Sequence, residues 1–402
     1  MLRRLRCPNC GETSALLALK PNPALSPLRV WAFSTRAPFF PPVFLLSVFL
    51  LTACSWFAPK SLSEAERHEL ARRLKAEIEW VGGSQVWVKG DTPGRFLPPR
   101  TEKPVEVLTV SVTFDPVLSA IKSHSEREGL AFRRKERREQ GRWRTAEVWL
   151  SRRRQQVGCW RVREVRQLQR AAIVIDDLGE DLEPVRKLLH LPCPLTFAVL
   201  PHLPHSTATA EEVHGTGREV MLHLPTEPEP GLIVPAGRGE IRVGMPSAEV
   251  ARVIQTDLDS VPYVVGVNNH MGSRATADPK LMTAVMKALA ERRLYFVDSR
   301  TTPASVALQV ARRMGLPAFS RAVFLDDVES VTYTLGQLRL FRGIIEKQGA
   351  ALAIGHPHPT TLAALARFLP ELERADIQVV PASQLVHLPE VTRLSPPGLV
   401  VP

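Results

Sequence analysis

From Ala171 onward, short apolar runs alternate with longer segments whose apolar residues recur every three or four positions. The short runs predict buried strands, and the longer spacing predicts helices with one buried face. Strand–helix alternation implies a parallel sheet, and seven or eight such units within 171–390 favour closure of that sheet into a barrel. The predicted strands are 171–176, 195–200, 218–223, 264–269, 294–297, 318–325, 350–355 and 377–380, and the predicted helices include 247–260, 279–292, 303–314, 331–347 and 360–369.

The preceding segment, 61–168, differs in pattern and predicts a small α+β domain. Ser61 and Glu64 have the spacing of a capping box, which predicts a helix that begins there and runs to about Trp80. His68 and His124 are expected at exposed helical positions. Proline and glycine residues predict a loop at 91–103. The remaining predicted elements are strands at 105–113, 146–150 and 157–165, a helix at 116–128, and a basic turn at 152–154.

Nearly all of the chain's net positive charge lies in one region of this small domain. The formal net charge is +11, and between Arg127 and Arg170 there are 15 Arg and Lys against 5 Asp and Glu, a net of +10. Such a region can attract anionic lipid or an acidic wall polymer, or can be a solvated face. A nucleic-acid partner is not expected, because the basic region lacks the interleaved aromatic residues of known nucleic-acid-binding modules.

The N-terminal segment, 1–54, predicts export. Arg36 precedes the apolar run 39–51, and Thr52-Ala53-Cys54 follows it. A charged lead, a short apolar core and small residues before a cleavage point are typical of a secretory signal. The ending resembles a bacterial lipobox, in which the cysteine is lipidated; an ordinary cleaved signal or a short anchor are the alternatives. We therefore expect a lipid anchor on Cys54, a spacer at 55–60, and a protein held at the membrane of the bacterial cell envelope, facing the periplasm.

Polar side chains that can bind a cation follow the predicted barrel strands. The apolar run 173–175 ends in two adjacent carboxylates, Asp176 and Asp177, which repel one another and resist burial unless they face a site. Because active sites of such barrels lie at the carboxyl ends of the strands, these groups are expected to converge on a divalent metal. The later strands that end in the same way lead into His223, His270, Asp298 and His356.

Five motifs carry a family resemblance across 171–390. They are Ile-Asp-Asp-Leu-Gly at 175–179, His-Leu-Pro-Thr-Glu-Pro at 223–228, Asn-Asn-His-Met-Gly-Ser at 268–273, Phe-Val-Asp-Ser-Arg-Thr at 296–301 and Ile-Gly-His-Pro-His at 354–358. In this order they resemble the divergent polysaccharide deacetylases, a branch of the NodB-type carbohydrate esterases. The resemblance implies a distorted (β/α) barrel, a divalent metal that is usually zinc, and hydrolytic removal of acetyl groups from an N-acetylated sugar polymer. Residues 391–402 would form a tail.

The resemblance also implies roles for individual residues. Asp176 is expected to act as general base and His356 as the general acid that protonates the leaving amine. Asp177, His223 and His270 are the expected metal ligands, with one coordination position left for water. Further residues expected to orient these groups or to bind substrate are Asn269, Asp298, Arg300, Glu227 and His358. Asp298 and Arg300 are expected either to orient His356 or to bind substrate.

The chain departs from the family pattern after His223. Ordinary deacetylases carry two metal-binding histidines a few residues apart, but Leu-Pro-Thr-Glu-Pro follows here. The second imidazole ligand must therefore come from His270 or from His358, and Glu227 is a further oxygen candidate. Both alternatives remain open from the sequence.

Three functions fit these features. The first is a metal-dependent deacetylase acting on an N-acetylated envelope glycan. The second is a catalytically weak or inactive glycan-binding envelope lipoprotein on the same fold, and the third is a metal-dependent hydrolase of another ester or a phosphoester. The adjacent carboxylates favour the first, because a protein that only binds glycan needs no base beside a metal ligand.

Overall fold

The computed structural model describes residues 62–89, 104–139, 143–153, 155–230 and 236–387. The predicted signal segment with Cys54, the spacer, the loop at 91–103 and the tail lie outside the described residues. Within the described ranges, no helix combines the length and the apolar character needed to cross a bilayer.

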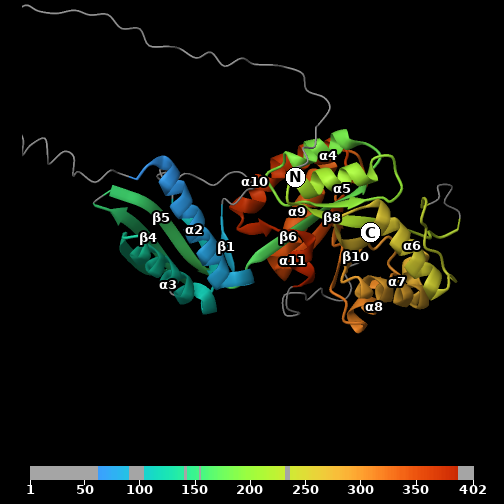
Figure 1. The fold of residues 1–402 in the computed structure, drawn as a ribbon, viewed down its shortest axis with the longest axis horizontal. Coiled ribbons are helices and arrows are strands. Elements are labelled where there is room, and N and C mark those ends of the chain that lie inside the picture. The colour runs from blue at the N-terminus through green and yellow to red at the C-terminus, as the bar shows by residue number, and fades with distance from the viewer. Residues whose placement is uncertain (1–61, 90–103, 140–142, 154, 231–235, 388–402) are drawn as a thin grey trace, which may run out of the picture. The chain divides into compact units, whose positions relative to one another are not determined.

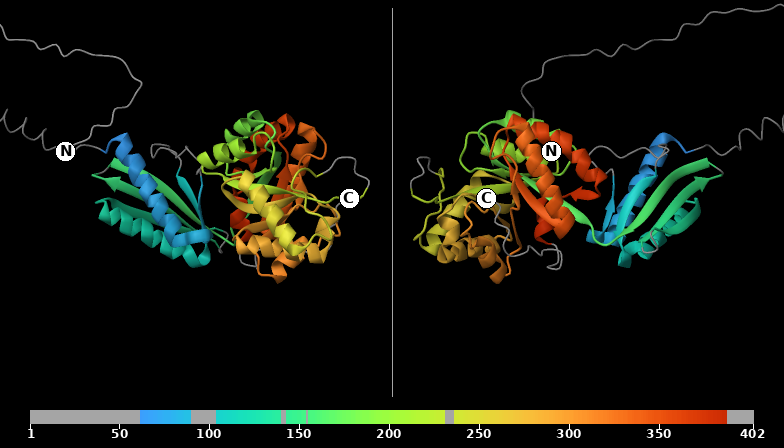
Figure 2. Two further views of the ribbon diagram at one scale, coloured as in Figure 1. Left: turned by 45° about the vertical axis from the view of Figure 1, so that its right-hand side comes forward. Right: turned by 180° about the vertical axis from the view of Figure 1, so that it is seen from behind.

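The small domain contains a mixed sheet with two helices on one face (Figures 1 and 2). Within the described residues the strand order is β1-β2-β5-β4-β3, and only the β2–β5 pair is parallel. Leu74, Ile78, Phe114 and Ile121 of the helices pack against the sheet. The elements are α2 (Glu64–Gly82), a short 3-10 turn (Gly83–Gln85), β1 (Val86–Val88), β2 (Val105–Val110), α3 (Ser111–Arg127), β3 (Ala131–Glu139), β4 (Trp143–Arg152) and β5 (Gln155–Val165).

Several local predictions for this domain were wrong. The capping box joins Ser63 and Glu66, two residues later than predicted. Helix α3 begins at Ser111, so the preceding strand ends at Val110. His124 is buried and its Nδ1 lies 2.8 Å from a carboxylate oxygen of Glu77. Strand β3 was missed because it is an edge strand in which eight of nine residues are exposed, so it shows no alternation of apolar and polar positions.

The second domain confirms the predicted α/β class. Its strands run parallel in the order β11-β10-β9-β8-β7-β6-β13-β12, and β14 pairs with the beginning of β6. The strands are β6 (Gln169–Leu178), β7 (Thr196–Val199), β8 (Glu219–Thr226), β9 (Val264–Met271), β10 (Tyr295–Asp298), β11 (Ala318–Ser320), β12 (Val323–Phe324), β13 (Ala350–Gly355) and β14 (Ile377–Val379). The helices are α4 (Leu182–Leu189), α5 (Ser206–Gly215), α6 (Ser247–Ser260), α7 (Pro279–Glu291) with a 3-10 turn before it (Ala275–Ala277), α8 (Ala307–Arg313), α9 (Val331–Gln348), α10 (Pro359–Arg374) and α11 (Ala382–Val386).

The sheet closes into a distorted barrel where the predicted strand 318–325 breaks in two. Its first part, β11, pairs with β10, and its second part, β12, pairs with β13 at the other edge of the sheet. The switch takes place between neighbouring residues: the Arg321 amide donates to the Asp298 carbonyl (3.0 Å), and the Ala322 amide donates to the Leu352 carbonyl (2.7 Å). The two edges are thus joined by one chain segment.

Alternation along each strand divides the apolar residues between two cores. On β6, Ile173 and Ile175 pack against the outer helices, whereas Ala172 and Val174 face the barrel interior. Helix α11 fills the amino-terminal end of the interior and contacts β6, β10, β11 and β13. The Ala382 amide there donates to Thr196 Oγ1 (3.0 Å) at the start of β7. Helix α11 therefore closes the interior at its amino-terminal end.

We predict that Gly272→Ala destabilises the fold by about 2–4 kcal/mol, because Gly272 combines a positive φ of 85° with a close contact. A Cβ there would lie 2.2 Å from Thr226 Oγ1, which donates to the His270 carbonyl and ties β8 to β9. Gly217→Ala is the matched control, since Gly217 has a φ of 74° with no atom within 4 Å and should cost about 1 kcal/mol. Urea denaturation measures the free energy of unfolding of both variants. Equal losses would contradict a cost from the contact between the new Cβ and Thr226 Oγ1.

Candidate metal centre

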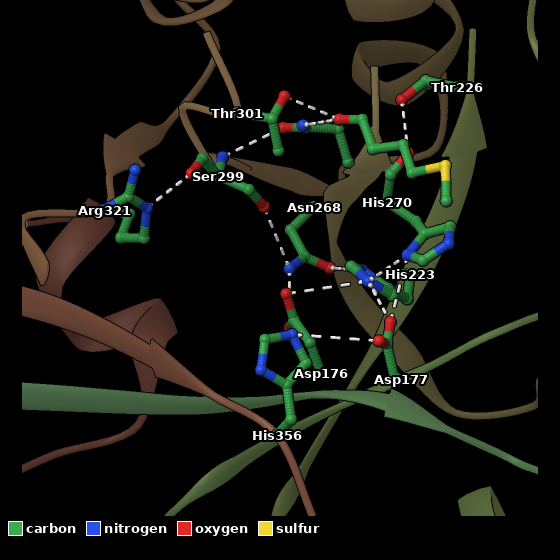
Figure 3. A network of polar contacts seen from close by, with 12 residues as sticks. Asp176, Asp177, His223, Thr226, Asn268, His270, Ser299, Thr301, Arg321 and His356 are labelled. Carbon is green, nitrogen blue, oxygen red and sulfur yellow. Dashed lines mark hydrogen bonds and ion pairs between the residues drawn. The ribbon is translucent and has the colours of Figure 1, made fainter. Parts of the chain in front are cut away.

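Side chains from β6, β8 and β9 converge at the carboxyl end of the barrel (Figure 3). Asp177 Oδ1 lies 3.0 Å from His223 Nε2 and 3.0 Å from His270 Nδ1, and the two ring nitrogens are 3.1 Å apart. Three potential ligand atoms from β6, β8 and β9 therefore form a nearly equilateral triangle.

Asp177 reaches this triangle because β6 contains a bulge. Neighbouring residues of a regular strand point to opposite faces, so Asp176 and Asp177 cannot both face the barrel interior. Between Ile175 and Leu178 the pairing with β7 shifts register, and Asp177 has a left-handed φ of 58°. Such a conformation is costly for a residue with a side chain, and strain of this kind collects at functional sites. The bulge directs both carboxylates into the same site.

His223 and His270 reach the site without a distortion of this kind at either residue. Met221 on β8 faces the interior, and so does His223 two residues later. On β9, Val267 packs against the outer helices, so Asn268 and His270 both lie on the interior side. Regular alternation places these groups in the site.

The triangle fits a divalent metal. A tetrahedral zinc site with bonds of about 2.0–2.1 Å separates neighbouring ligand atoms by about 3.3 Å, close to the distances present here. Asp177 Oδ1 is buried and has no hydrogen-bond partner of acceptable geometry among the described residues. A carboxylate and two imidazoles leave room for further ligands, as catalytic sites require. These three residues would therefore hold the metal.

Burial and charge act in opposite directions on these groups. Burial raises the pKa of Asp176 above its usual range. Burial acts in the same direction on Asp177, but contacts with His223 and His270 outweigh it and hold the pKa of that carboxyl well below its usual range. For His223 burial lowers the pKa, but the charges of Asp176 and Asp177 outweigh it and raise the pKa. Metal binding must therefore displace a proton from His223.

His356 lies on the opposite side of Asp177 from this triangle. Its Nε2 is 3.8 Å from Asp177 Oδ2, and its Nδ1 is 2.9 Å from Asp326 Oδ1. Burial lowers the pKa of His356, but Asp326 outweighs it, and the pKa rises to about 9. Asp326 Oδ2 accepts from the His356 amide (2.7 Å) and from Thr361 Oγ1 (2.5 Å), so the carboxylate is held in place. His356 can therefore carry a proton at neutral pH.

Asp326 was missed by the sequence analysis, although a signal was present. The apolar run 323–325 ends in two adjacent acids, as the run 173–175 does. The predicted partner of His356, Asp298, instead accepts from Ser305 Oγ (2.8 Å) and the Arg300 amide (2.8 Å), which shapes the loop after β10. Asp298 follows Phe296 in alternation and lies on its helix-facing side. Predicting that Asp298 orients His356 was therefore wrong.

The remaining predicted residues lie around the site. Asn269 accepts from the Ser299 amide (2.9 Å) and donates to the Met271 carbonyl, joining β9 to β10. Glu227 accepts from the Val243 amide (2.7 Å) and pairs with Arg274 (2.7 Å), so its carboxylate holds the loop after β8. Arg300 has a φ of 49° and is exposed, and its carbonyl accepts from Arg321.

His358 belongs to a second cluster with Asp326 and His356. Its Nδ1 is 3.7 Å from Glu329, and the rings of His356 and His358 are 5.8 Å apart. Asp326 already accepts three hydrogen bonds, so it is poorly placed to bind a cation as well. Of the two imidazoles left open by the sequence, His270 is the one that lies beside Asp177 and His223.

We predict that the protein binds one divalent metal per chain, and that Asp177→Ala, His223→Ala or His270→Ala lowers its affinity at least about 100-fold. Plasma mass spectrometry of dialysed protein and competition with a chromophoric chelator measure this. His358→Ala is the matched control and should retain the metal; equal loss in that variant would move the centre to the second cluster.

Comparison with known proteins agrees with the motifs. Residues 173–386 match the family described as divergent polysaccharide deacetylase. The uncharacterized protein YibQ of Escherichia coli (strain K12) is 38% identical over 231 residues, covering 58% of this chain and 72% of that protein. An uncharacterized protein of Haemophilus influenzae is 38% identical over 209 residues, covering 52% of this chain and 74% of that protein. A solved structure, an uncharacterized protein from Agrobacterium tumefaciens C58, shares the fold with a TM-score of 0.52 and 22% identity, covering 54% of this chain and 89% of that chain. The chain therefore belongs to the divergent polysaccharide deacetylase family.

Proposed function

We propose that this protein is a metal-dependent hydrolase that removes acetyl groups from an N-acetylated polysaccharide. One observation carries the proposal: a candidate base, a metal-ligand triangle and a candidate acid meet at one end of the barrel. Asp176 Oδ2 lies 3.6 Å from His223 Nε2, and His356 Nε2 lies 3.8 Å from Asp177 Oδ2. Hydrolysis of an amide needs these three components, because water must lose a proton, the carbonyl must be polarised and the amine must gain a proton.

Each side chain then has a task. A divalent metal held by Asp177, His223 and His270 would polarise the acetamide carbonyl and activate water. Asp176 takes a proton from the attacking water, and its raised pKa makes it a stronger base than an exposed carboxylate. His356 donates its Nε2 proton to the nitrogen as the carbon–nitrogen bond breaks. Acetate and a free amino sugar are the products.

The finer features of the proposal come from the sequence. Zinc is the metal that the family resemblance implies. The signal-like segment and the lipobox-like ending at Cys54 support export and a lipid anchor in the bacterial cell envelope. An exported enzyme of this family would meet N-acetylated envelope glycans, which we therefore propose as its substrate.

We predict that Asp176→Asn lowers kcat/KM for acetate release from peptidoglycan or chitooligosaccharides about 10²–10⁴-fold while metal content stays unchanged. The amide keeps the shape of the carboxylate but cannot take the proton. Asp181→Asn is the matched control, because asparagine caps helix α4 as well as aspartate does. A metal-loaded wild type that releases no acetate from any such glycan would favour the inactive glycan-binding protein instead.

We predict a bell-shaped pH profile whose alkaline limb moves to lower pH in Asp326→Asn. The acid must be protonated, and the pKa of His356, about 9, sets the pH above which its proton is lost. Removing the Asp326 charge lowers the pKa of His356, so the alkaline fall in kcat/KM should occur at a pH about one unit or more lower than in the wild type. The measurement is kcat/KM against pH, and an unmoved alkaline limb would assign that limb to a different group.

A further inference from the structure

We propose that Asn268 is a positioning residue that fixes His223 in the tautomer suited to metal binding and, at its other end, holds Asp176. This inference rests on the proposed function, because its two partners are the proposed ligand and the proposed base. Asn268 is completely buried on β9 and lies between the two side chains (Figure 3). The family resemblance implied no role for Asn268.

The two ends of the Asn268 amide have different partners. Its Nδ2 donates to Asp176 Oδ1 (2.8 Å) and lies 3.4 Å from Ser299 Oγ. Its Oδ1 lies 2.9 Å from His223 Nδ1. Asp176 can act as the base of the proposed function only when it is ionised, and an ionised carboxylate can only accept hydrogen bonds. The amide nitrogen therefore faces Asp176 and the amide oxygen faces His223.

This orientation determines which nitrogen of His223 carries the proton. The Asn268 oxygen accepts the Nδ1 proton, which leaves the lone pair of neutral His223 on Nε2. Nε2 is the atom that points to Asp177 and His270. The Asp176 carboxylate therefore sets the ring orientation of His223 through one intervening amide.

His223 and His356 differ in the charge of the group that lies beside Nδ1. His223 has a neutral amide beside Nδ1, whereas His356 has the carboxylate of Asp326 at the corresponding atom. A third carboxylate beside Asp176 and Asp177 would add like charge in a buried space.

Two substitutions at Asn268 separate its two contacts. Asn268→Leu keeps the approximate volume and removes both hydrogen bonds, so zinc affinity should fall about 10–100-fold. Asn268→Asp keeps an acceptor for His223 but places a like charge against Asp176. It should retain zinc affinity within about tenfold and keep the Nδ1 proton on His223.

The neighbouring Asn269 provides the matched control. It is of the same residue type, is also buried, and its hydrogen bonds within the described ranges go to the backbone groups of Ser299 and Met271. Asn269→Leu should change the unfolding midpoint without changing the His223 tautomer or lowering zinc affinity more than about threefold.

The readouts are zinc affinity by chelator competition and the His223 tautomer by ¹H–¹⁵N correlation NMR of the full chain labelled at histidine. Unchanged affinity and tautomer in Asn268→Leu would overturn the proposal, as would an equal loss of affinity in Asn268→Leu and Asn268→Asp. If Asn268→Leu does not fold, the test rests on Asn268→Asp alone. Loss of the His223 Nδ1 proton or of zinc binding in that variant would overturn the proposal. None of these measurements uses a glycan, so failure of acetate release would reject the proposed function and leave this test intact.

Discussion

The site depends on one local distortion, the bulge that lets two consecutive acids of β6 share a face. On a regular strand the Asp177 side chain would point toward the outer helices, away from His223 and His270. The shifted pairing with β7 and the left-handed φ of Asp177 turn it inward instead. This conformation carries strain that the flanking strands β7 and β13 must support, and both are buried at every residue. The rigidity of the barrel therefore maintains a backbone shape that the isolated segment would not adopt.

Three imidazoles gather around that bulge, and their surroundings make them chemically different. His223 is bonded to a buried amide, His356 to a buried carboxylate, and His270 directs its Nδ1 into the ligand triangle. The pKa values of His223 and His356 are thus raised by different partners, Asp176 and Asp177 for the first and Asp326 for the second. A chain that lacks a pair of nearby histidines can still bring a carboxylate and two imidazoles together in this way, because separate strands supply them.

Closure of the barrel positions His356, the proposed acid, and its partner Asp326. Where the chain passes from β11 to β12, the Arg321 guanidinium donates to the Ser299 carbonyl (2.6 Å) and stacks on Phe324 at 3.7 Å. Burial lowers the pKa of Arg321 to about 10, which still leaves it charged at neutral pH. The same short segment fixes the loop after β10 and carries Asp326 to the end of β13, beside His356. One strand break therefore connects the two edges and orients the proposed acid.

The sequence by itself determined the strand–helix order, the parallel class and the family, because apolar periodicity and local motifs are properties of consecutive residues. The same alternation placed His223, His270 and His356 inward, and applied to 295–298 it would have placed Asp298 outward. Only the tertiary structure decided which imidazole lies beside Asp177, that β6 bulges, and that Asp326 rather than Asp298 meets His356. These depend on pairing register and barrel closure, which join residues far apart in the chain and leave no local periodic signal.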